Sequence, residues 1–326
     1  MSSLVNITSR VPPGLSPFED MVWVPGGTFL MGSDHHYAEE APAHEVTVDG
    51  FWMDRYTVTN REFRRFVEAT GYVTFAERAP KAEDYPGAKP EMLVPGSIMF
   101  KKAAGPVDLR NHFNWWDWAP GASWRHPRGP ASSLGGLAKH PVVHVAYEDA
   151  EAYARWAGKE LPAEAEWEFA ARGGLEAAEF CWGNEFTPKG KAMCNSWQGE
   201  FPFENLLTDG YEWTAPVGSF PPNGYGLHEM AGNVWEWTTD WYQEHGQIVN
   251  SCCGNVNPRG GEREKSYDPC TPNVPIPRKV MKGGSYLCAP NYCRRYRPAA
   301  RMAQPVDTST CHLGFRCIVR VKPDAQ

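Results

Sequence analysis

Short clusters of apolar residues near the start of the chain predict β-strands. Residues 22–29 (VWVPGGTF) combine β-branched and aromatic positions with a turn signal, which predicts a strand broken at Pro25–Gly27. Residues 45–48 alternate between polar and apolar positions and lead into Phe51–Met53. We expect these last two segments to form a pair of strands.

One helix is predicted from Thr59–Asn60, which can cap its start, to about Thr70, where Gly71 ends it. The apolar residues recur at helical spacing and define one buried face: Phe63, Phe66 and Val67.

Two further short helices are predicted in the middle of the chain. Residues 148–156 form an amphipathic pattern closed by Gly158, and Pro162 opens a second helix that Gly173–Gly174 terminates. Carboxylates early in a helix interact well with its dipole, and this helix has three of them: Glu164, Glu166 and Glu168.

The remaining segments carry turn signals more than regular periodicity. Residues 76–118 are rich in Pro and Gly and predict a long, ordered loop, which in a compact domain is usually functional. Beyond residue 174 no clear helix is expected. The pattern predicts an α+β chain that forms one domain with little regular secondary structure.

Composition narrows the class of partner. The 326 residues include 14 Trp, 31 Gly and 29 Pro, which is typical of a loop-rich fold packed by rings. A net charge of −7 argues against non-specific binding to nucleic acid or to an anionic membrane. The first 20 residues lack the apolar core of a signal peptide, and no apolar run reaches about 18 residues. Nine Cys, an odd number, indicate free thiols in a reducing cytoplasm. We expect a cytoplasmic monomer.

The most informative chemistry is a pair of cysteines, Cys288 and Cys293. A spacing of five places them on different faces of a helix or strand, so only a turn lets both sulfurs converge, and residues 289–291 (APN) are turn residues. Two convergent thiolates without a third soft ligand suit copper(I). The thiolate form is favoured by nearby cations, of which the sequence has three: Arg294, Arg295 and Arg297.

Three other interpretations of these cysteines remain open on the residues alone. Together with Cys311 and Cys317 they could form a four-thiolate zinc site, although the spacings are wider than usual. The pair could also form a disulfide. Finally, they could be unrelated buried thiols.

A longer motif surrounds these cysteines: residues 283–288 (GGSYLC), four intervening residues, the second cysteine, then Arg-Tyr-Arg and, later, residues 313–317 (LGFRC). This motif resembles the C-terminal signature of the formylglycine-generating enzyme family, bacterial type. The resemblance extends from about Val22 to Cys317 and includes, in family order, Trp124–Pro127, His140–Val145, Trp156–Lys159, Leu161–Glu168, Trp197–Gly199 and Gly232–Trp237.

The resemblance implies a single irregular C-type-lectin-like domain, here residues 21–322 after an N-terminal extension of residues 1–20. It implies that Cys288 and Cys293 bind copper(I) and that Ser285 lies beside them as a polar group for oxygen or its products. Trp235 and Tyr292 would wall the pocket.

The implied activity is copper-dependent oxidation, by molecular oxygen, of a cysteine in a Cys-x-Pro-x-Arg segment of an unfolded sulfatase to Cα-formylglycine. The alternative is a family member that oxidises a different thiol or peptide, or a non-catalytic lectin-like binding module. The intact cysteine pair argues against a pure binder.

The family also implies two calcium sites made of hard oxygen ligands on loops. The first maps to Asn195, Ser196, Asp209 and Tyr211, and the second to Glu229, Gly232, Val234 and Glu236. The alternative is that Asn195 and Asp209 only cap turns.

Several positions depart from the family pattern. His312 stands where Asn is usual, Ala289 where His is common, and residues 76–114 do not resemble the corresponding segment that lines the peptide groove. Glu83–Asp84 in that segment could receive a substrate arginine or could simply be solvated. Structural cysteines of eukaryotic relatives are absent at three positions: Ala154, Ala171 and Pro298.

Overall fold

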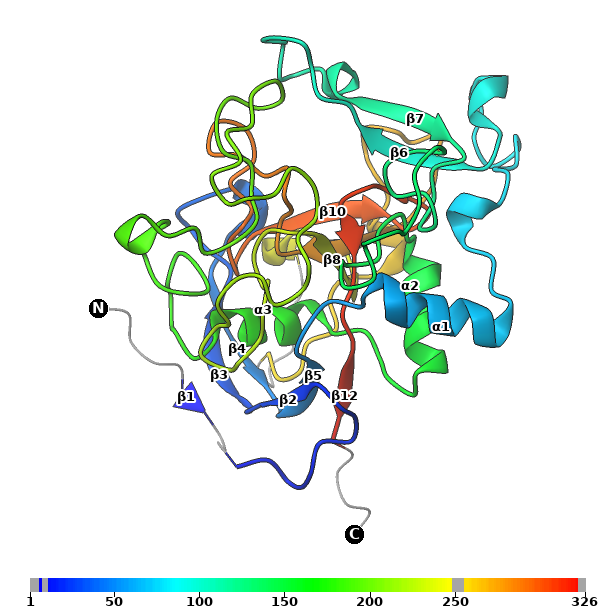
Figure 1. Ribbon diagram of the computed structural model, residues 1–326. Helices are drawn as coiled ribbons and strands as arrows, with labels where there is room; N and C mark the ends of the chain where they lie inside the picture. Colours follow the sequence, from blue (N-terminus) through cyan, green and yellow to red (C-terminus); the bar gives the residue numbers. More distant parts are fainter. Residues whose placement is uncertain (1–5, 8–10, 248–254, 322–326) are drawn as a thin grey trace.

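The computed structural model describes residues 6–7, 11–247 and 255–321. Within them, short strands form sheets ordered β1-β3-β4, β12-β5-β2, β10-β9-β8-β11 and β6-β7, and the helices lie among them (Figure 1). The strands are β1 Asn6–Ile7, β2 Met21–Val24, β3 Gly27–Met31, β4 His44–Val48, β5 Phe51–Asp54, β6 Gly96–Phe100, β7 Trp116–Pro120, β8 Trp235–Trp241, β9 Arg278–Lys282, β10 Arg301–Pro305, β11 Leu313–Gly314 and β12 Ile318–Arg320. The α-helices are α1 Asn60–Thr70, α2 Tyr147–Trp156 and α3 Glu164–Arg172. The predicted mixed α+β class with little regular structure is confirmed.

Strands β2 to β5 form one bent antiparallel ribbon. β2 pairs with β5 and β3 pairs with β4 in a continuous register, so β4 and β5 lie in different sheets instead of pairing with each other as the sequence predicted. The bend is possible because Gly26 and Gly50 cross closely: a Cβ atom on Gly26 would lie 2.7 Å from the Gly50 nitrogen. The predicted break in the first strand is confirmed, although Gly27 already belongs to β3.

The first two helices agree with their local signals. The Thr59 hydroxyl accepts from the Glu62 N–H and the Glu62 carboxylate accepts from the Thr59 N–H, which completes a capping box for α1. Gly71 ends α1 in the left-handed conformation with φ 68°. α2 begins one residue before the predicted start, and its N-terminus is capped by the Asp149 carboxylate.

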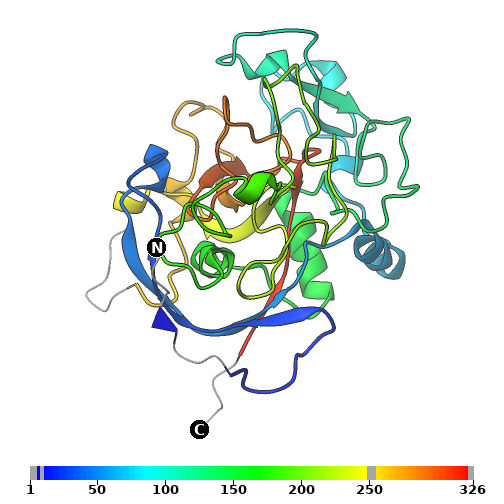
Figure 2. The same cartoon turned by 60° about the vertical axis from the view of Figure 1, so that its left-hand side comes forward.

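The third helix is the centre of the molecule. Every residue of α3 is buried, and the helix packs against β3, β4, β8 and β9. Figure 2 shows the ribbon of β2 to β5, in blue, curving around one side of α3. The carboxylates of α3 are paired with cations from the C-terminal part of the chain: Glu164 with Arg301, Glu166 with Arg320 and Glu168 with Lys282. Because each charge is compensated, the helix can be buried whole.

The segment predicted as a loop contains a two-stranded sheet. β6 and β7 pair over five residues, and this hairpin forms the top of the molecule in Figure 1. The loop prediction was therefore wrong for residues 96–100 and 116–118, because the pairing is set by a partner 20 residues away instead of by local alternation. Glu83 and Asp84 lie on the exposed part of this segment, with Glu83 4.0 Å from Lys81.

After α3 the described residues contain no further α-helix, as predicted. β8 and β9 are central strands of their sheet, and the connection from β9 to β10 carries both cysteines of the candidate site. Gly284 is required at its start, where φ is 71° and a Cβ would lie 2.8 Å from the Arg295 backbone. No helix in the described part of the chain is long and apolar enough to cross a membrane.

Candidate active site

A tight turn brings the two cysteines together. The N–H groups of Tyr292 and Cys293 both donate to the Ala289 carbonyl, at 3.2 and 2.9 Å. As a result the Sγ atoms of Cys288 and Cys293 lie 3.2 Å apart. Both residues are buried, with 1% and 9% of their surface exposed. The predicted convergence of the two sulfurs is confirmed.

In its described part, the structure contains neither a disulfide between these cysteines nor a four-thiolate zinc site. Cys288 and Cys293 are free thiols in hydrogen-bond contact, since a disulfide would bring the sulfurs to about 2.05 Å. Cys311 lies elsewhere, where its sulfur accepts from the Phe100 N–H and the Tyr286 hydroxyl. Among the described residues no group of three or more His, Cys, Asp or Glu side chains could hold a metal, which rules out the four-thiolate zinc arrangement.

The two thiols have opposite electrostatic environments. The hydrogen bond from Cys288 and the nearby Arg295 charge outweigh burial and lower the pKa of Cys293 to about 6. Burial, together with the hydrogen bond to Cys293, raises the pKa of Cys288 well above its usual value. The surroundings therefore favour the thiolate form at Cys293 and the thiol form at Cys288.

Only one of the three neighbouring arginines touches the pair. Arg295 Nη1 lies 3.7 Å from Cys293 Sγ. Arg294 pairs with Glu179 and Arg297 pairs with Glu40, so their charges are compensated by other acids. Of the three arginines predicted to favour the thiolate form, Arg295 is the one that contacts a thiol.

Ser285 lies beside the pair and is held on several sides. Its N–H donates to Cys288 Sγ at 3.4 Å, and its hydroxyl accepts from the Leu287 N–H at 3.2 Å. The same hydroxyl lies 3.2 Å from His312 Nδ1. The His312 ring packs edge-on against Trp116 from β7, with centroids 4.9 Å apart. The hairpin that sequence analysis missed thus supports this side of the site.

Aromatic rings cover the other side. The Tyr292 ring stacks on Phe201 with centroids 4.6 Å apart and meets the edge of Trp115 at 5.2 Å. Tyr292, which precedes Cys293 in the chain, is 38% exposed. Trp235 is buried at the start of β8, and its backbone N–H donates to the His312 carbonyl. The role of both rings as pocket walls stays a prediction.

The first predicted calcium site has the features of a cation site. The Asn195 side chain is buried, and its Oδ1 atom has no hydrogen-bond partner among the described residues, although its Nδ2 donates to the Trp213 carbonyl. The Asp209 carboxylate accepts from the N–H groups of Ser196 and Tyr211, both at 3.0 Å. Gln198 Nε2 donates to both the Ser196 carbonyl and Asp209, so a cation would have to replace this amide. The orphaned, buried Asn195 Oδ1 needs a donor or a cation and is the feature that fits calcium.

The second predicted calcium site fits a cation less well. Both Glu236 oxygens accept from Arg316, at 2.8 and 2.9 Å, and one also accepts from the Trp167 indole. Glu229 accepts from the N–H groups of Gly218 and Phe220. Gly232 (φ 73°) and the buried Val234 lie on the backbone between these two acids. A cation would compete with the Arg316 guanidinium for Glu236.

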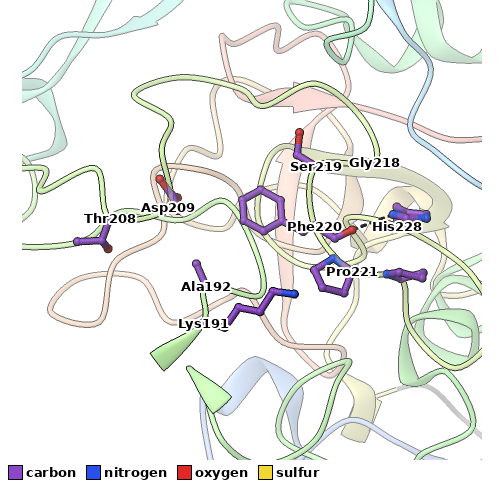
Figure 3. A pocket seen from close by; sticks show the side chains of 10 residues that line it. Lys191, Ala192, Thr208, Asp209, Gly218, Ser219, Phe220, Pro221 and His228 are labelled. Carbon is purple, nitrogen blue, oxygen red and sulfur yellow. Dashed lines mark hydrogen bonds between the residues drawn. The ribbon is translucent and has the colours of Figure 1, made fainter. Parts of the chain in front are cut away.

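A separate cavity of about 560 Å³ opens on another part of the surface (Figure 3). Asp209 contributes to its wall, and the His228 ring at its edge bonds to the Phe220 carbonyl. Figure 3 shows Lys191 and Phe220 facing this space. Neither active-site cysteine lines it, so the cavity borders the first predicted calcium site and not the cysteine pair.

Sequence analysis missed the partners of the site that come from distant segments. Glu39 and Tyr37 contact Arg295 from more than 250 residues away, and Phe201 and Trp115 flank Tyr292. The acidic pair Glu39–Glu40 has no local signal that separates it from a solvated loop.

Comparison with known proteins places the chain in a family. Residues 9–321 match the model of the Sulfatase-modifying factor enzyme 1-like domain, named FGE-sulfatase. The chain therefore belongs to this family. It is 51% identical over 302 residues to the formylglycine-generating enzyme of Mycobacterium tuberculosis, covering 92% of this chain and 97% of that protein. It is also 38% identical over 308 residues to the inactive C-alpha-formylglycine-generating enzyme 2 of Mus musculus, covering 91% of this chain and 84% of that protein.

The fold is also found in a solved structure of low sequence similarity. The structure of PvdO from Pseudomonas aeruginosa superposes with a TM-score of 0.65 at 23% identity, covering 96% of this chain and all of that one. At this identity the likeness concerns the fold alone.

Proposed function

We propose that this chain converts a cysteine in a Cys-x-Pro-x-Arg segment of an unfolded sulfatase to Cα-formylglycine with copper(I) and molecular oxygen. The observation that carries the proposal is the buried cysteine pair, with 3.2 Å between the sulfurs, in a chain 51% identical to a formylglycine-generating enzyme. Conversion of the sulfatase cysteine follows from the relatives. The need for copper and oxygen is the further step.

The donor set supports copper(I). Cys288 and Cys293 would hold the ion, because two convergent sulfurs without a third metal-binding side chain in the described residues suit a soft, two-coordinate metal. Bound copper(I) supplies one-electron chemistry toward oxygen. The lowered pKa of Cys293 favours the deprotonated form that a metal ligand needs.

The surrounding residues would orient the reactants and limit water. Ser285 presents a hydroxyl beside Cys288 that is fixed by Leu287 and His312. Tyr292, backed by Phe201, would border the place where a substrate thiol approaches Cys293. An aromatic border excludes water and so limits side reactions of reduced oxygen.

Electron balance defines the assay. Replacing the thiol by an aldehyde oxygen releases hydrogen sulfide and removes two electrons from the cysteine. Complete reduction of oxygen to water takes four electrons, so an added thiol reductant must supply the other two. The test is to incubate a Cys-Thr-Pro-Ser-Arg peptide with protein, copper, air and dithiothreitol and to measure peptide mass. A product lighter by the difference between thiol and aldehyde supports the proposal, and an unchanged mass rejects it.

A second candidate function has its own support. The relative at 38% identity is named as inactive, and residues 76–114 lack the family pattern at the peptide groove. The chain could therefore oxidise a different thiol or peptide, or act as a lectin-like binding module. The cysteine pair separates these outcomes: copper binding without conversion of the sulfatase peptide points to another substrate, and no copper binding points to a binder.

Three accompanying proposals remain. We propose calcium at the first loop site, since Asn195 Oδ1 is a buried acceptor lacking a described partner. We propose the cytoplasm as location, because the described cysteines are all free thiols. We propose that the protein works as a monomer, which light scattering at assay concentration tests.

A further inference from the structure

The cation next to the cysteine pair is fixed by a distant acidic segment. Glu39 Oε1 accepts from both Nε and Nη2 of Arg295, at 3.1 and 2.5 Å. The Tyr37 ring lies under the same guanidinium, 3.9 Å from its centre. With these two contacts the guanidinium has little freedom, and its remaining nitrogen, Nη1, is directed to Cys293 Sγ at 3.7 Å.

The neighbouring acid–arginine pairs do not share this arrangement. Glu179 pairs with Arg294 at 2.9 Å, with half of the Arg294 side chain and 29% of the Glu179 side chain exposed. Glu40 pairs with Arg297, and both are fully buried. The described contacts of Arg294 and Arg297 do not include either thiol. Glu39 is therefore the acid whose arginine reaches the sulfur.

Charge explains why a fixed cation belongs there. Two thiolates on one copper(I) ion carry a net charge of −1, and a substrate thiolate raises it to −2. Such charge in a mostly buried site is unfavourable unless a cation compensates it. Arg295 is the cation that contacts the pair.

We propose that Arg295 is the counter-cation of the copper–thiolate centre and that Glu39, with Tyr37 beneath, is a positioning residue that holds the guanidinium against Cys293. The inference rests on the proposed function, because it takes Cys288 and Cys293 as the copper ligands. It adds residues from the start of the domain to the surroundings of the two cysteines.

The direction in which copper(I) affinity changes when Glu39 is replaced distinguishes a positioning role from a purely electrostatic effect of its charge. Glu39 is itself negative, so its removal would tighten binding of an anionic centre if only the field at the site mattered. If Glu39 acts by holding Arg295, its removal weakens binding, because the partly exposed guanidinium then turns to water. Glu179→Gln removes one negative charge from the neighbouring Arg294–Glu179 pair, whose arginine does not contact either thiol. It therefore measures the electrostatic effect of losing a nearby carboxylate without moving Arg295.

The experiment measures copper(I) affinity without turnover. Purified full-length protein competes anaerobically with a coloured copper(I) chelator, for wild type, Glu39→Gln, Glu179→Gln, Arg295→Met and the double variant Glu39→Gln/Arg295→Met. We expect Arg295→Met to weaken affinity about tenfold or more and Glu39→Gln about three- to tenfold. Glu179→Gln should leave affinity unchanged or slightly tighter. In the Arg295→Met background Glu39→Gln should have no further effect.

The possible results distinguish the two proposals. If wild type binds copper(I) but Glu39→Gln behaves like Glu179→Gln, the positioning role is overturned and the proposed function stands. If wild type binds no copper(I), the proposed copper chemistry falls, and the role of Arg295 with it. Thermal unfolding of each variant identifies loss of fold, and Glu39→Asp, which keeps the charge, should recover part of the affinity if positioning is correct.

Discussion

The Nδ1 atom of His312 lies 3.2 Å from the hydroxyl oxygen of Ser285, whose N–H contacts the sulfur of Cys288. Burial lowers the pKa of His312 to about 3, so the imidazole is neutral at physiological pH. A neutral imidazole can donate to this hydroxyl or accept from it, according to tautomer. In either case the Ser285 hydroxyl is held by two partners, the Leu287 N–H and His312.

Replacing His312 tests this support. We expect His312→Ala to lower turnover of the peptide about tenfold with little change in copper(I) affinity, because Ser285 loses orientation while the sulfurs remain. His312→Asn keeps a side-chain donor and acceptor and should retain most activity. Steady-state kcat and copper(I) affinity together check the prediction. Equal losses in the Ala and Asn variants would mean that packing against Trp116, and not the hydrogen bond, matters.

The cysteine pair itself is tested by substitution. Cys288→Ser and Cys293→Ser should each abolish copper(I) binding and peptide conversion, because a hydroxyl is a poor ligand for a soft metal. Cys270→Ser, which changes an exposed free thiol, should have no effect. Metal content and the peptide mass assay are measured on the same preparations. Turnover retained in Cys288→Ser would remove the mechanism.

The pH dependence of stability is set in part by His144. This residue is fully buried, its ring bonds to the Ser97 hydroxyl and the Pro127 carbonyl, and burial lowers its pKa from 6.5 to about 4. The unfolded state therefore binds more protons between these values. Stability from this group is complete above pH 6.5 and is lost as the pH falls toward 4, by about 3 kcal/mol.

Urea unfolding at several pH values between 4 and 7 checks this expectation. His144→Asn, which suits the positive φ of 59° at this position, should flatten that part of the profile. His35→Asn on the exposed surface should leave the profile unchanged. An equal acid loss in wild type and His144→Asn would show that other groups control it.

Calcium should stabilise the fold through the first loop site. A ligand at 100 times its dissociation constant stabilises by about 2.7 kcal/mol, so chelation should lower the midpoint of thermal unfolding by several degrees and added calcium should restore it. Asp209→Asn should weaken this response. Because Arg316 already occupies Glu236, we expect calorimetry to find one tight calcium ion per chain. Two tight ions would restore the second predicted site, and none would reject both.

Local signals predicted the parts of the fold that are locally determined. All the signals that define α1 lie within the helix or next to it: the Thr59 cap, the apolar face with Phe63 and the terminating Gly71. The sequence therefore located this helix correctly. The turn between Cys288 and Cys293 is equally local, so the convergence of the sulfurs could be inferred from their spacing.

Features that depend on distant partners could not be predicted. β6 has weak strand character by itself and is defined by pairing with β7. The separation of β4 from β5 depends on the close crossing of Gly26 and Gly50. The contact of Glu39 with Arg295 joins residues 256 positions apart, and a single sequence has no signal for such pairs.

The ion pairs of α3 have a consequence for how the protein matures on the ribosome. Glu168, Glu164 and Glu166 find their cations 114, 137 and 154 residues further along the chain. Glu168 also pairs with Arg172 within the helix, but until Arg301 and Arg320 have been synthesised, burial would leave Glu164 and Glu166 without these counter-charges, at a cost of several kcal/mol each. We therefore expect the helix to stay hydrated in the nascent chain until Arg301 and Arg320 have been made, so that the core closes late and cooperatively.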